Sequence, residues 1–262
     1  MLGSAVLLAA CDDTRPVAGA AAPEPAGAGV AATTTAVPAS TGTTAVSATT
    51  VVTVPATVTT AAPEPATTTT LGPGAKGPSV VALQRRLAEL GYNPGTADGA
   101  FGGSTASAVM AFQKVEQLSV DGVPGPETMA RLDAPRGAIP AGGALRIEID
   151  LARQVLFVVG AGQTRVFNTS TGNNEPFSWP DGTPALAYTP TGTFAVYHRH
   201  DGMFEGELGN MYRPLFFTGD WAVHGSGYVP AYPASHGCAR VSNADQDWIW
   251  QHIPTGTPVV VR

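Results

Sequence analysis

The sequence predicts a multidomain protein in which a small all-α domain of three helices precedes a mostly β domain with one C-terminal helix. Apolar residues recur at helical spacing between residues 79 and 132, whereas alternating and β-branched runs follow residue 145. A stretch rich in Ala, Thr and Pro precedes both domains, and it shows neither helical spacing nor strand-like alternation. These observations divide the chain into residues 1–11, 12–71, 72–134, 135–143 and 144–262.

The composition excludes one class of partner. The net charge is −6 and the sequence has no basic stripe, which argues against nucleic acid. The 31 glycines and 23 prolines indicate long segments outside any core. The two cysteines, Cys11 and Cys238, lie in different kinds of sequence, so we expect no disulfide between them.

Residues 1–11 form a short apolar run that ends Leu8-Ala9-Ala10-Cys11. The run resembles the end of a secretory signal with a lipobox, which implies diacylation of Cys11 and anchoring to a membrane. It lacks a positively charged start and is too short to span a bilayer. Either the start codon is misplaced, or the run is not an export signal.

Residues 12–71 contain almost no large apolar side chain. Such a segment cannot offset its own ordering entropy, so we expect a disordered, extended stalk. The stalk would hold the folded part away from a membrane. O-glycosylated threonines and a plain flexible linker both fit its composition.

Three helices are expected between residues 79 and 132. The first would start at a Ser79 cap and run to about Leu90, the second would open at Ser104 or Thr105, and the third would begin at Pro126. Before the second and third helices stand two similar turns, 98–102 and 121–125, each beginning Asp-Gly. The region is therefore an internal pseudo-repeat of turn and helix.

Residues 73–134 resemble the three-helix peptidoglycan-binding domain of cell-wall enzymes. The matching positions are Val81, Leu83, Gln84, Leu87, Leu90-Gly91-Tyr92, Asp98-Gly99, Phe101-Gly102, Thr105, Ala108-Val109, Phe112-Gln113, Leu118, Asp121-Gly122, Gly125 and Thr128. The resemblance implies binding to peptidoglycan. A helical spacer without affinity is the alternative, because most of these residues serve turns and core.

Residues 135–143 are expected to be a second linker, followed by strands. The expected strands are 145–150, 154–159, 164–169, 193–198, 215–217, 221–224 and 257–261, with a hairpin turn at 160–162. Ser242 to Asp245 reads as a capping box for a helix that ends near His252.

Cys238 is the candidate nucleophile, because one cysteine with histidine partners is the minimum for covalent acyl transfer. A thiol has a pKa of about 8.5, and an imidazole can accept its proton. His236 and His224 precede it by two and fourteen residues. Spacing alone leaves either histidine as the base. The N–H of Cys238, with that of Gly237, is the expected oxyanion donor.

Residues 143–262 resemble a YkuD-type L,D-transpeptidase catalytic domain, a β-sandwich. The matching segments are Ile149-Asp150-Leu151, Gln154, Ser170-Thr171-Gly172, Thr189–Phe194, Val223-His224-Gly225 and Ser235-His236-Gly237-Cys238.

This resemblance implies a reaction and its residues. Cys238 would form a thioester with a peptidoglycan tetrapeptide stem and release D-alanine, and an amine of a second stem would complete a 3→3 cross-link. His224 would be the base, oriented by a backbone carbonyl of the Gly225-Ser226 turn, and His236 would shape the pocket. Reaction with carbapenems is also implied.

The remaining site predictions concern substrate binding. Arg240 is expected to bind a stem carboxylate, with a structural ion pair as the alternative. Further pocket and substrate-binding candidates are Ser226, Ser235, Tyr212, Phe216 and Trp221. No metal or organic cofactor is expected, although His198, His200 and Asp201 lie close together. The rival functions are an L,D-carboxypeptidase that uses water and a non-catalytic wall-binding protein.

Overall fold

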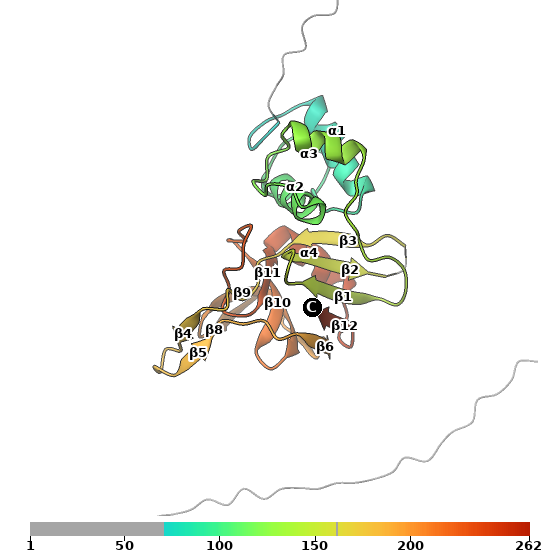
Figure 1. The fold of residues 1–262 in the computed structure, drawn as a ribbon. Coiled ribbons are helices and arrows are strands. Elements are labelled where there is room, and N and C mark those ends of the chain that lie inside the picture. Colours follow the sequence, from blue (N-terminus) through green and yellow to red (C-terminus); the bar gives the residue numbers. More distant parts are fainter. Residues whose placement is uncertain (1–70, 161) are drawn as a thin grey trace, which may run out of the picture. The chain divides into compact units, whose positions relative to one another are not determined.

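The computed structural model describes residues 71–160 and 162–262. The predictions for Cys11 and for most of the 12–71 stalk lie outside these residues. A helical part comes first, with α1 (Pro78–Glu89), α2 (Gly103–Glu116) and α3 (Pro126–Asp133). A mostly β part follows and contains α4 (Asn243–His252) near its end (Figure 1).

The first two helices begin slightly earlier than the sequence predicts. The predicted Ser79 cap is wrong, because Gly77 is the N-cap of α1 and Pro78 occupies the first turn. Gly77 has φ 115°, a conformation that glycine adopts readily, and proline fixes a φ that suits the first turn of a helix. The second helix starts at Gly103, after the N-cap Gly102, rather than at Ser104 or Thr105.

The pseudo-repeat in the sequence corresponds to a repeated hydrogen-bond arrangement. In the first copy the buried Gln84 amide donates to Asp98 Oδ1 at 3.0 Å and accepts the N–H of Gly99 at 2.9 Å. In the second copy the buried Gln113 donates to Asp121 Oδ1 at 2.7 Å and accepts the N–H of Gly122 at 2.9 Å. In each copy a helix therefore fixes the Asp-Gly turn through one glutamine side chain.

The β part contains two larger sheets and one small one. The first has the strand order β3-β2-β1-β12-β6, the second has β11-β10-β9-β7 with β8 also paired to β9, and β4 pairs with β5. The strands are β1 (Arg146–Asp150), β2 (Val155–Val159), β3 (Arg165–Asn168), β4 (Pro176–Ser178), β5 (Pro184–Leu186), β6 (Gly192–Ala195), β7 (His198–Arg199), β8 (Met203–Gly206), β9 (Gly209–Thr218), β10 (Trp221–Ser226), β11 (Ala239–Ser242) and β12 (Pro258–Val261).

Several strands differ from the prediction. The expected strand 193–198 is divided into β6 and β7, which belong to different sheets. The expected strand 215–217 is the end of the longer β9. The hairpin β4–β5 and the strand β8 were not predicted, and Figure 1 shows them projecting from the body of the β part.

The two larger sheets share one apolar core. Ile147 and Leu156 of the first sheet are buried in the same cluster as Leu215 and Val223 of the second, and Ile249 of α4 joins them. Ser242 caps α4 by accepting the N–H of Asp245, which confirms the predicted cap. The core thus fixes β9, β10 and β11 under the residues discussed below.

The helical part and the first sheet also pack together. Phe112 and Tyr92 lie in one buried cluster with Phe157 and Val166. The N–H of Val166 donates to the Gly91 carbonyl at 3.0 Å. A Cβ on Gly91 would lie 2.5 Å from the Thr164 carbonyl oxygen, so this close approach requires glycine.

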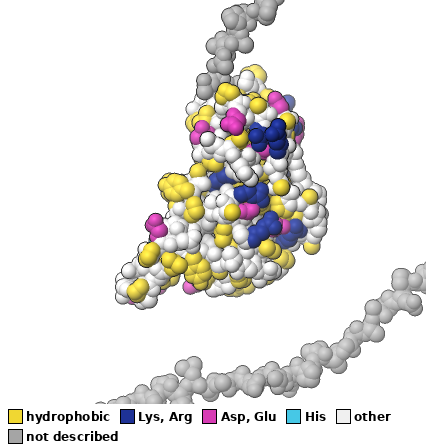
Figure 2. Space-filling view, in the orientation of Figure 1, with side chains coloured by type: hydrophobic (Ala, Val, Ile, Leu, Met, Phe, Trp, Pro, Cys, Tyr) yellow, Lys and Arg dark blue, Asp and Glu magenta, His cyan; other side chains and the backbone are white. Residues whose placement is uncertain are grey.

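The described residues show neither a membrane-spanning helix nor a one-signed surface in the view of Figure 2. None of their helices is both long enough and apolar enough to cross a membrane. On the face in Figure 2, Lys and Arg form separate small groups with acidic side chains nearby.

Candidate active site

A cleft of about 1160 Å³ opens beside Cys238. Residues of β10 and the turn before β11 line one side, and the β4–β5 and β8–β9 hairpins line the other. His224, His236, Gly237, Cys238 and Arg240 all line it. The structure therefore brings together the residues that the sequence analysis selected from two separate segments.

Strand pairing brings the backbone of Cys238 close to that of His224. In the parallel pair β10–β11, His224 lies opposite Arg240. Cys238 immediately precedes β11, which begins at Ala239. The Cys238 Sγ atom also lies 3.4 Å from the N–H of Ala222, the residue two before His224.

The His224 ring is held in one orientation. Nδ1 lies 2.9 Å from the Gly225 carbonyl oxygen, so Nδ1 carries the hydrogen and Nε2 has the free lone pair. The backbone carbonyl predicted to orient the ring is therefore present, although Gly225 and Ser226 belong to strand β10 and not to a turn. Gly225 itself is required, because a Cβ would lie 2.7 Å from Asn243 Oδ1.

Burial keeps both reactive groups uncharged in the resting protein. It lowers the pKa of His224 to about 4, and the hydrogen bond to Gly225 opposes this only in part. It also raises the pKa of the Cys238 thiol, although the Ala222 N–H and Arg240 favour the thiolate. Near neutral pH the pair is a thiol and a neutral imidazole, rather than a thiolate–imidazolium ion pair.

The turn before Cys238 is fixed by Ser235 and Gly237. Ser235 Oγ donates to the Cys238 carbonyl at 2.6 Å and accepts the N–H of Gly237 at 3.0 Å. Ser235 is buried but lines the cleft, so its contact with substrate stays a prediction. The Gly237 N–H is thus already occupied, and of the two N–H groups that the sequence suggested, only that of Cys238 remains a candidate oxyanion donor.

Arg240 has no carboxylate partner among the described residues. Its Nη1 donates to the Ala234 carbonyl at 3.1 Å, and the guanidinium lines the cleft. The alternative of a structural ion pair is therefore not observed here. Burial lowers the pKa of this guanidinium, but an arginine remains charged.

Aromatic side chains form much of the cleft lining. The His236 ring packs against Phe177 of β4, with centroids 4.8 Å apart. Trp221 lines the cleft and donates its Nε1–H to the Tyr188 carbonyl at 2.8 Å. Phe216 also lines the cleft, and both it and Trp221 occupy the predicted location.

Tyr212 is not among the cleft residues, contrary to the prediction. Its hydroxyl donates to Asp247 Oδ1 at 2.9 Å on α4. Ser226 does line the cleft, and its hydroxyl is bonded to the backbone of Tyr228.

Sequence reasoning missed the projecting hairpins. Trp179, Asp181, Glu205 and Glu207 line the cleft from the β4–β5 and β8–β9 hairpins. The turn signal Pro180-Asp181-Gly182 between two apolar segments could have identified the first of them. In the second, β8 has only four residues, so the sequence offered little signal there.

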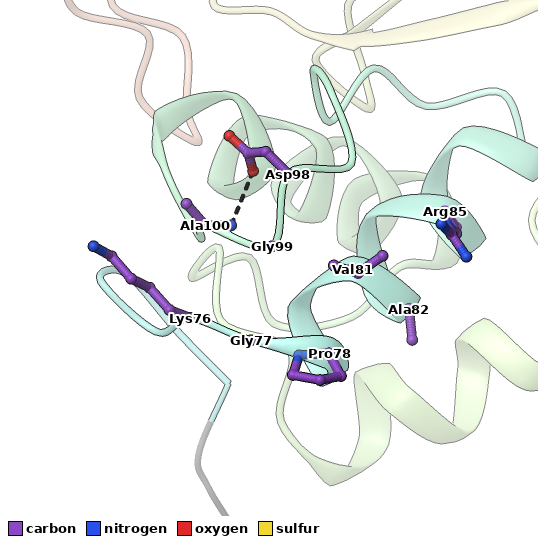
Figure 3. A pocket seen from close by; sticks show the side chains of 9 residues that line it. All are labelled: Lys76, Gly77, Pro78, Val81, Ala82, Arg85, Asp98, Gly99 and Ala100. Atoms are coloured by element: carbon purple, nitrogen blue, oxygen red, sulfur yellow. Dashed lines mark hydrogen bonds between the residues drawn. The ribbon is translucent and has the colours of Figure 1, made fainter.

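Two further locations carry polar side chains. The described residues contain no group of three His, Cys, Asp or Glu side chains that could hold a metal ion. His198, His200 and Asp201 therefore do not form such a group. A second, shallower hollow of about 750 Å³ lies in the helical part (Figure 3). Val81 and Ala82 of α1 line it together with Lys76, Arg85 and the turn 98–100.

The fold and the cleft define a class: a helical domain followed by a mostly β domain whose cleft contains a cysteine and a histidine. The peptidoglycan-binding family model ("putative peptidoglycan binding domain") matches residues 76–132, and the L,D-transpeptidase catalytic domain model matches residues 144–261. An L,D-transpeptidase structure from Xylanimonas cellulosilytica is 46% identical, with a TM-score of 0.71, and the match covers 76% of this chain and 100% of that one. The chain therefore belongs to the L,D-transpeptidase family, which confirms the resemblance seen in the sequence.

Curated relatives match over shorter lengths. An N-acetylmuramoyl-L-alanine amidase of Mycobacterium tuberculosis is 45% identical over 56 residues, which are 21% of this chain and 14% of that protein. A spore cortex-lytic enzyme of Halalkalibacterium halodurans is 45% identical over 60 residues, 23% of this chain and 18% of that protein. The chain thus spans less than a fifth of either curated relative.

Proposed function

We propose that this protein is a peptidoglycan L,D-transpeptidase that forms 3→3 cross-links through a Cys238 thioester. The observation that supports this most is that His224 and Cys238 line the same cleft, whose volume of about 1160 Å³ suits a peptide stem. The two packed sheets are interpreted as the β-sandwich of the family, and the helical part as its three-helix peptidoglycan-binding domain.

Acylation begins with a neutral thiol. The Cys238 sulfur attacks the carbonyl carbon that precedes the terminal D-alanine of a tetrapeptide stem, while Nε2 of His224 takes the thiol proton. The tetrahedral intermediate collapses when the C–N bond breaks and the imidazolium protonates the leaving amine. D-Alanine departs, and the stem remains bound to Cys238 as a thioester.

Deacylation uses the same groups in reverse. The side-chain amine of a second stem attacks the thioester carbonyl and loses a proton to His224. The carbon–sulfur bond then breaks, the thiolate regains its proton from His224, and the new amide is the cross-link. His236, packed on Phe177, shapes the wall of the pocket beside this reaction.

Two groups are proposed to stabilise the bound stem. The N–H of Cys238 is proposed to donate to the developing oxyanion, a role suited to the residue that carries the nucleophile. Arg240 lines the cleft and has no carboxylate partner among the described residues, so it is suited to a carboxylate of the stem. Replacing Arg240 by Gln should raise KM for the donor stem at least tenfold and change kcat much less.

Mass spectrometry of the intact protein tests the thioester. With a tetrapeptide stem the native chain should gain the mass of the stem minus D-alanine, and Cys238→Ala should gain nothing. His224→Ala should slow acylation at least 100-fold, because a general base contributes 10²–10⁴ in rate. Loss of acylation with His236→Ala but not with His224→Ala would assign the base to the other histidine.

The acceptor decides between two activities. Digested sacculi treated with the protein should contain 3→3 dimers if an amine is the acceptor. Tripeptide monomers alone would establish the L,D-carboxypeptidase, in which water attacks the thioester. Absence of any adduct or product would leave the non-catalytic wall-binding protein as the function.

The helical part is proposed to bind peptidoglycan, and the hollow in Figure 3 is its candidate site. Lys76 and Arg85 are exposed there and could meet stem carboxylates. Full-length protein with Arg85→Ala should be retained less on purified sacculi than native protein. The matched control is Arg136→Ala, an exposed arginine outside the hollow that removes the same charge.

We also propose that the protein acts outside the cytoplasm, in the cell wall. Peptidoglycan-acting domains support this location. Anchoring through a diacylated Cys11 remains part of the proposal, and mass spectrometry of the N-terminal peptide from the membrane fraction tests it. Unmodified Cys11 in that fraction would exclude the lipid anchor.

A further inference from the structure

Lys114 is a buried cation that the proposed reaction does not use. It belongs to α2 of the helical part, and only 5% of its surface is exposed. Its ammonium donates to the Gln154 carbonyl at 2.9 Å, to Asn168 Oδ1 at 2.5 Å and to the Thr169 carbonyl at 2.9 Å. An ammonium has three N–H donors, so each donor has an acceptor in the β part.

The acceptor residue Thr169 is bonded to the strand that follows Cys238. Thr169 Oγ1 donates to the Arg240 carbonyl at 2.8 Å. The next residue, Ser170, exchanges two backbone hydrogen bonds with Arg240, at 3.1 and 3.0 Å. Arg240 is two residues from Cys238, so this path joins Lys114 to the nucleophile through one strand end.

The acceptor residue Gln154 is connected through Thr171 to the turn before Cys238. The Gln154 side chain donates to Thr171 Oγ1 at 2.7 Å and accepts the Thr171 N–H at 2.9 Å. The Thr171 carbonyl accepts the N–H of Ser235 at 2.9 Å. Ser235 in turn holds the Cys238 carbonyl.

The acceptor residue Asn168 is bonded to the loop that follows β10. Asn168 Nδ2 donates to the Val229 carbonyl at 3.3 Å, next to the cleft residue Tyr228. One ammonium is therefore the common origin of three hydrogen-bond paths. Two of them reach the backbone on either side of Cys238, and the third reaches the residue after Tyr228. A buried polar network of this kind specifies one geometry only when every member is satisfied.

We propose that Lys114 is a positioning residue for Cys238, so that the helical domain forms a structural part of the active site. Lys114 holds residues 168–171, and these residues hold the strand and the turn on both sides of the cysteine. The role in acylation rests on the proposed function of Cys238. The role in ordering the cysteine turn does not, and the two are measured separately.

The test compares Lys114→Met with a second variant that also removes a contact between the helical and β parts. Ser107 donates to Asp245 Oδ2 at 3.2 Å, a contact that leads into α4 and not into residues 168–171. Ser107→Ala is therefore the matched control. All proteins are full-length and measured at pH 6, because burial lowers the pKa of Lys114 to about 7 and the native ammonium is charged there.

The first measurement is amide hydrogen exchange, which needs no catalytic activity. Lys114→Met should raise exchange at least tenfold in peptides that contain residues 168–172 and 234–240. Ser107→Ala should leave both peptides within twofold of native. Native-like protection of both peptides in Lys114→Met would overturn the proposal, whatever reaction the protein catalyses.

The second measurement is the ratio of two rates at Cys238. Acylation by a carbapenem needs the positioned base and oxyanion donor, whereas alkylation by iodoacetamide needs only an accessible thiol. The ratio should fall at least tenfold in Lys114→Met and stay within twofold in Ser107→Ala. Unfolding would also lower this ratio, because it exposes Cys238 and removes the burial that raises the thiol pKa. The ratio is therefore compared only at temperatures well below the Tm of each variant, and an unchanged ratio there contradicts the proposal.

Thr169→Val keeps the test decisive if Lys114→Met does not fold. This change preserves shape and the carbonyl that Lys114 binds, but it removes the hydroxyl that donates to Arg240. Exchange in residues 239–242 should rise at least threefold, and the ratio of acylation to alkylation should fall by a similar factor. No change in either quantity would show that the path through Thr169 does not position Cys238.

Discussion

The hydroxyl of Ser235 donates to the carbonyl of Cys238 at 2.6 Å, so a side chain three residues earlier closes the turn that presents the thiol. The same oxygen accepts the N–H of Gly237 at 3.0 Å. One buried hydroxyl thus satisfies a donor and an acceptor of the backbone beside the nucleophile. This geometry gives the serine a structural role beside the nucleophile.

Replacing Ser235 by alanine should leave the Gly237 N–H buried without a partner. An unsatisfied buried donor costs about 1–3 kcal/mol, so unfolding in denaturant should show a loss of this size. The carbapenem acylation rate should fall about tenfold, because the turn no longer fixes the Cys238 N–H.

Ser226→Ala is the control for this variant. Ser226 also lines the cleft, but its hydroxyl bonds only to the backbone of the neighbouring Tyr228. We expect native stability to within about 0.5 kcal/mol. Equal effects of the two substitutions would mean that the Ser235 bridge is unimportant.

The pH dependence of acylation should reveal a neutral resting pair. His224 can accept a proton only when unprotonated, and burial lowers its pKa to about 4. Acylation by a carbapenem should therefore rise with pH through about 4 and be level between pH 5 and 6. A cysteine activated by an imidazole of ordinary pKa would instead lose rate as pH falls from 7 to 6.

Alkylation of Cys238 by iodoacetamide gives the complementary profile. Burial raises the thiol pKa, so the alkylation rate should still be increasing at pH values where an ordinary thiol is already ionised. Peptide mapping separates this signal from Cys11. A level alkylation rate from pH 5 upward would demonstrate a resting thiolate and contradict the neutral pair.

The parts of the site that the sequence could predict are local. Cys238 and His224 stand in short glycine-containing motifs, and the capping residue Ser242 is recognisable from its spacing to Asp245. Strands with period-two or β-branched patterns, such as 145–150, were likewise found close to their true positions.

The parts that could not be predicted depend on contacts distant in sequence. Lys114 lies 40 residues or more from its acceptors, and nothing in helix periodicity distinguishes it from a solvated lysine. Tyr212 is an aromatic candidate for the cleft by sequence, but its hydroxyl donates to Asp247 of α4 instead. Such outcomes follow from tertiary packing, which overrides local pattern.

Gly237 should tolerate no side chain. Its φ is 149°, and a Cβ would lie 2.6 Å from Trp221 Nε1 and 2.7 Å from the Tyr188 carbonyl oxygen. Gly237→Ala must therefore disrupt the Trp221–Tyr188 hydrogen bond or displace the cysteine turn. We expect acylation to fall at least 100-fold, together with a lower Tm.

The control for this change is Gly227→Ala, in the same region of the chain. A Cβ on Gly227 would meet nothing within 4 Å. Its acylation rate and Tm should match those of the native protein. Native-like acylation in Gly237→Ala would show that the close approach to Trp221 and Tyr188 can relax without consequence.

Substituting the two glutamines of the pseudo-repeat should distinguish an effect on stability from an effect on peptidoglycan binding. Gln84→Met and Gln113→Met each remove a buried amide that satisfies an Asp-Gly turn, so each should lower the free energy of unfolding by about 2 kcal/mol or more. The turn held by Gln84 contributes Asp98 and Gly99 to the hollow in Figure 3, whereas the turn held by Gln113 does not.

Retention of the full-length variants on purified sacculi should therefore differ. Gln84→Met should reduce retention at least threefold under conditions where both variants are folded, and Gln113→Met should bind like native protein. Native-like retention of both variants would exclude the hollow as the binding site, even though both variants lose stability. An equal loss in both would instead show that binding depends on the integrity of the helical part as a whole, and not on the Asp98–Gly99 turn.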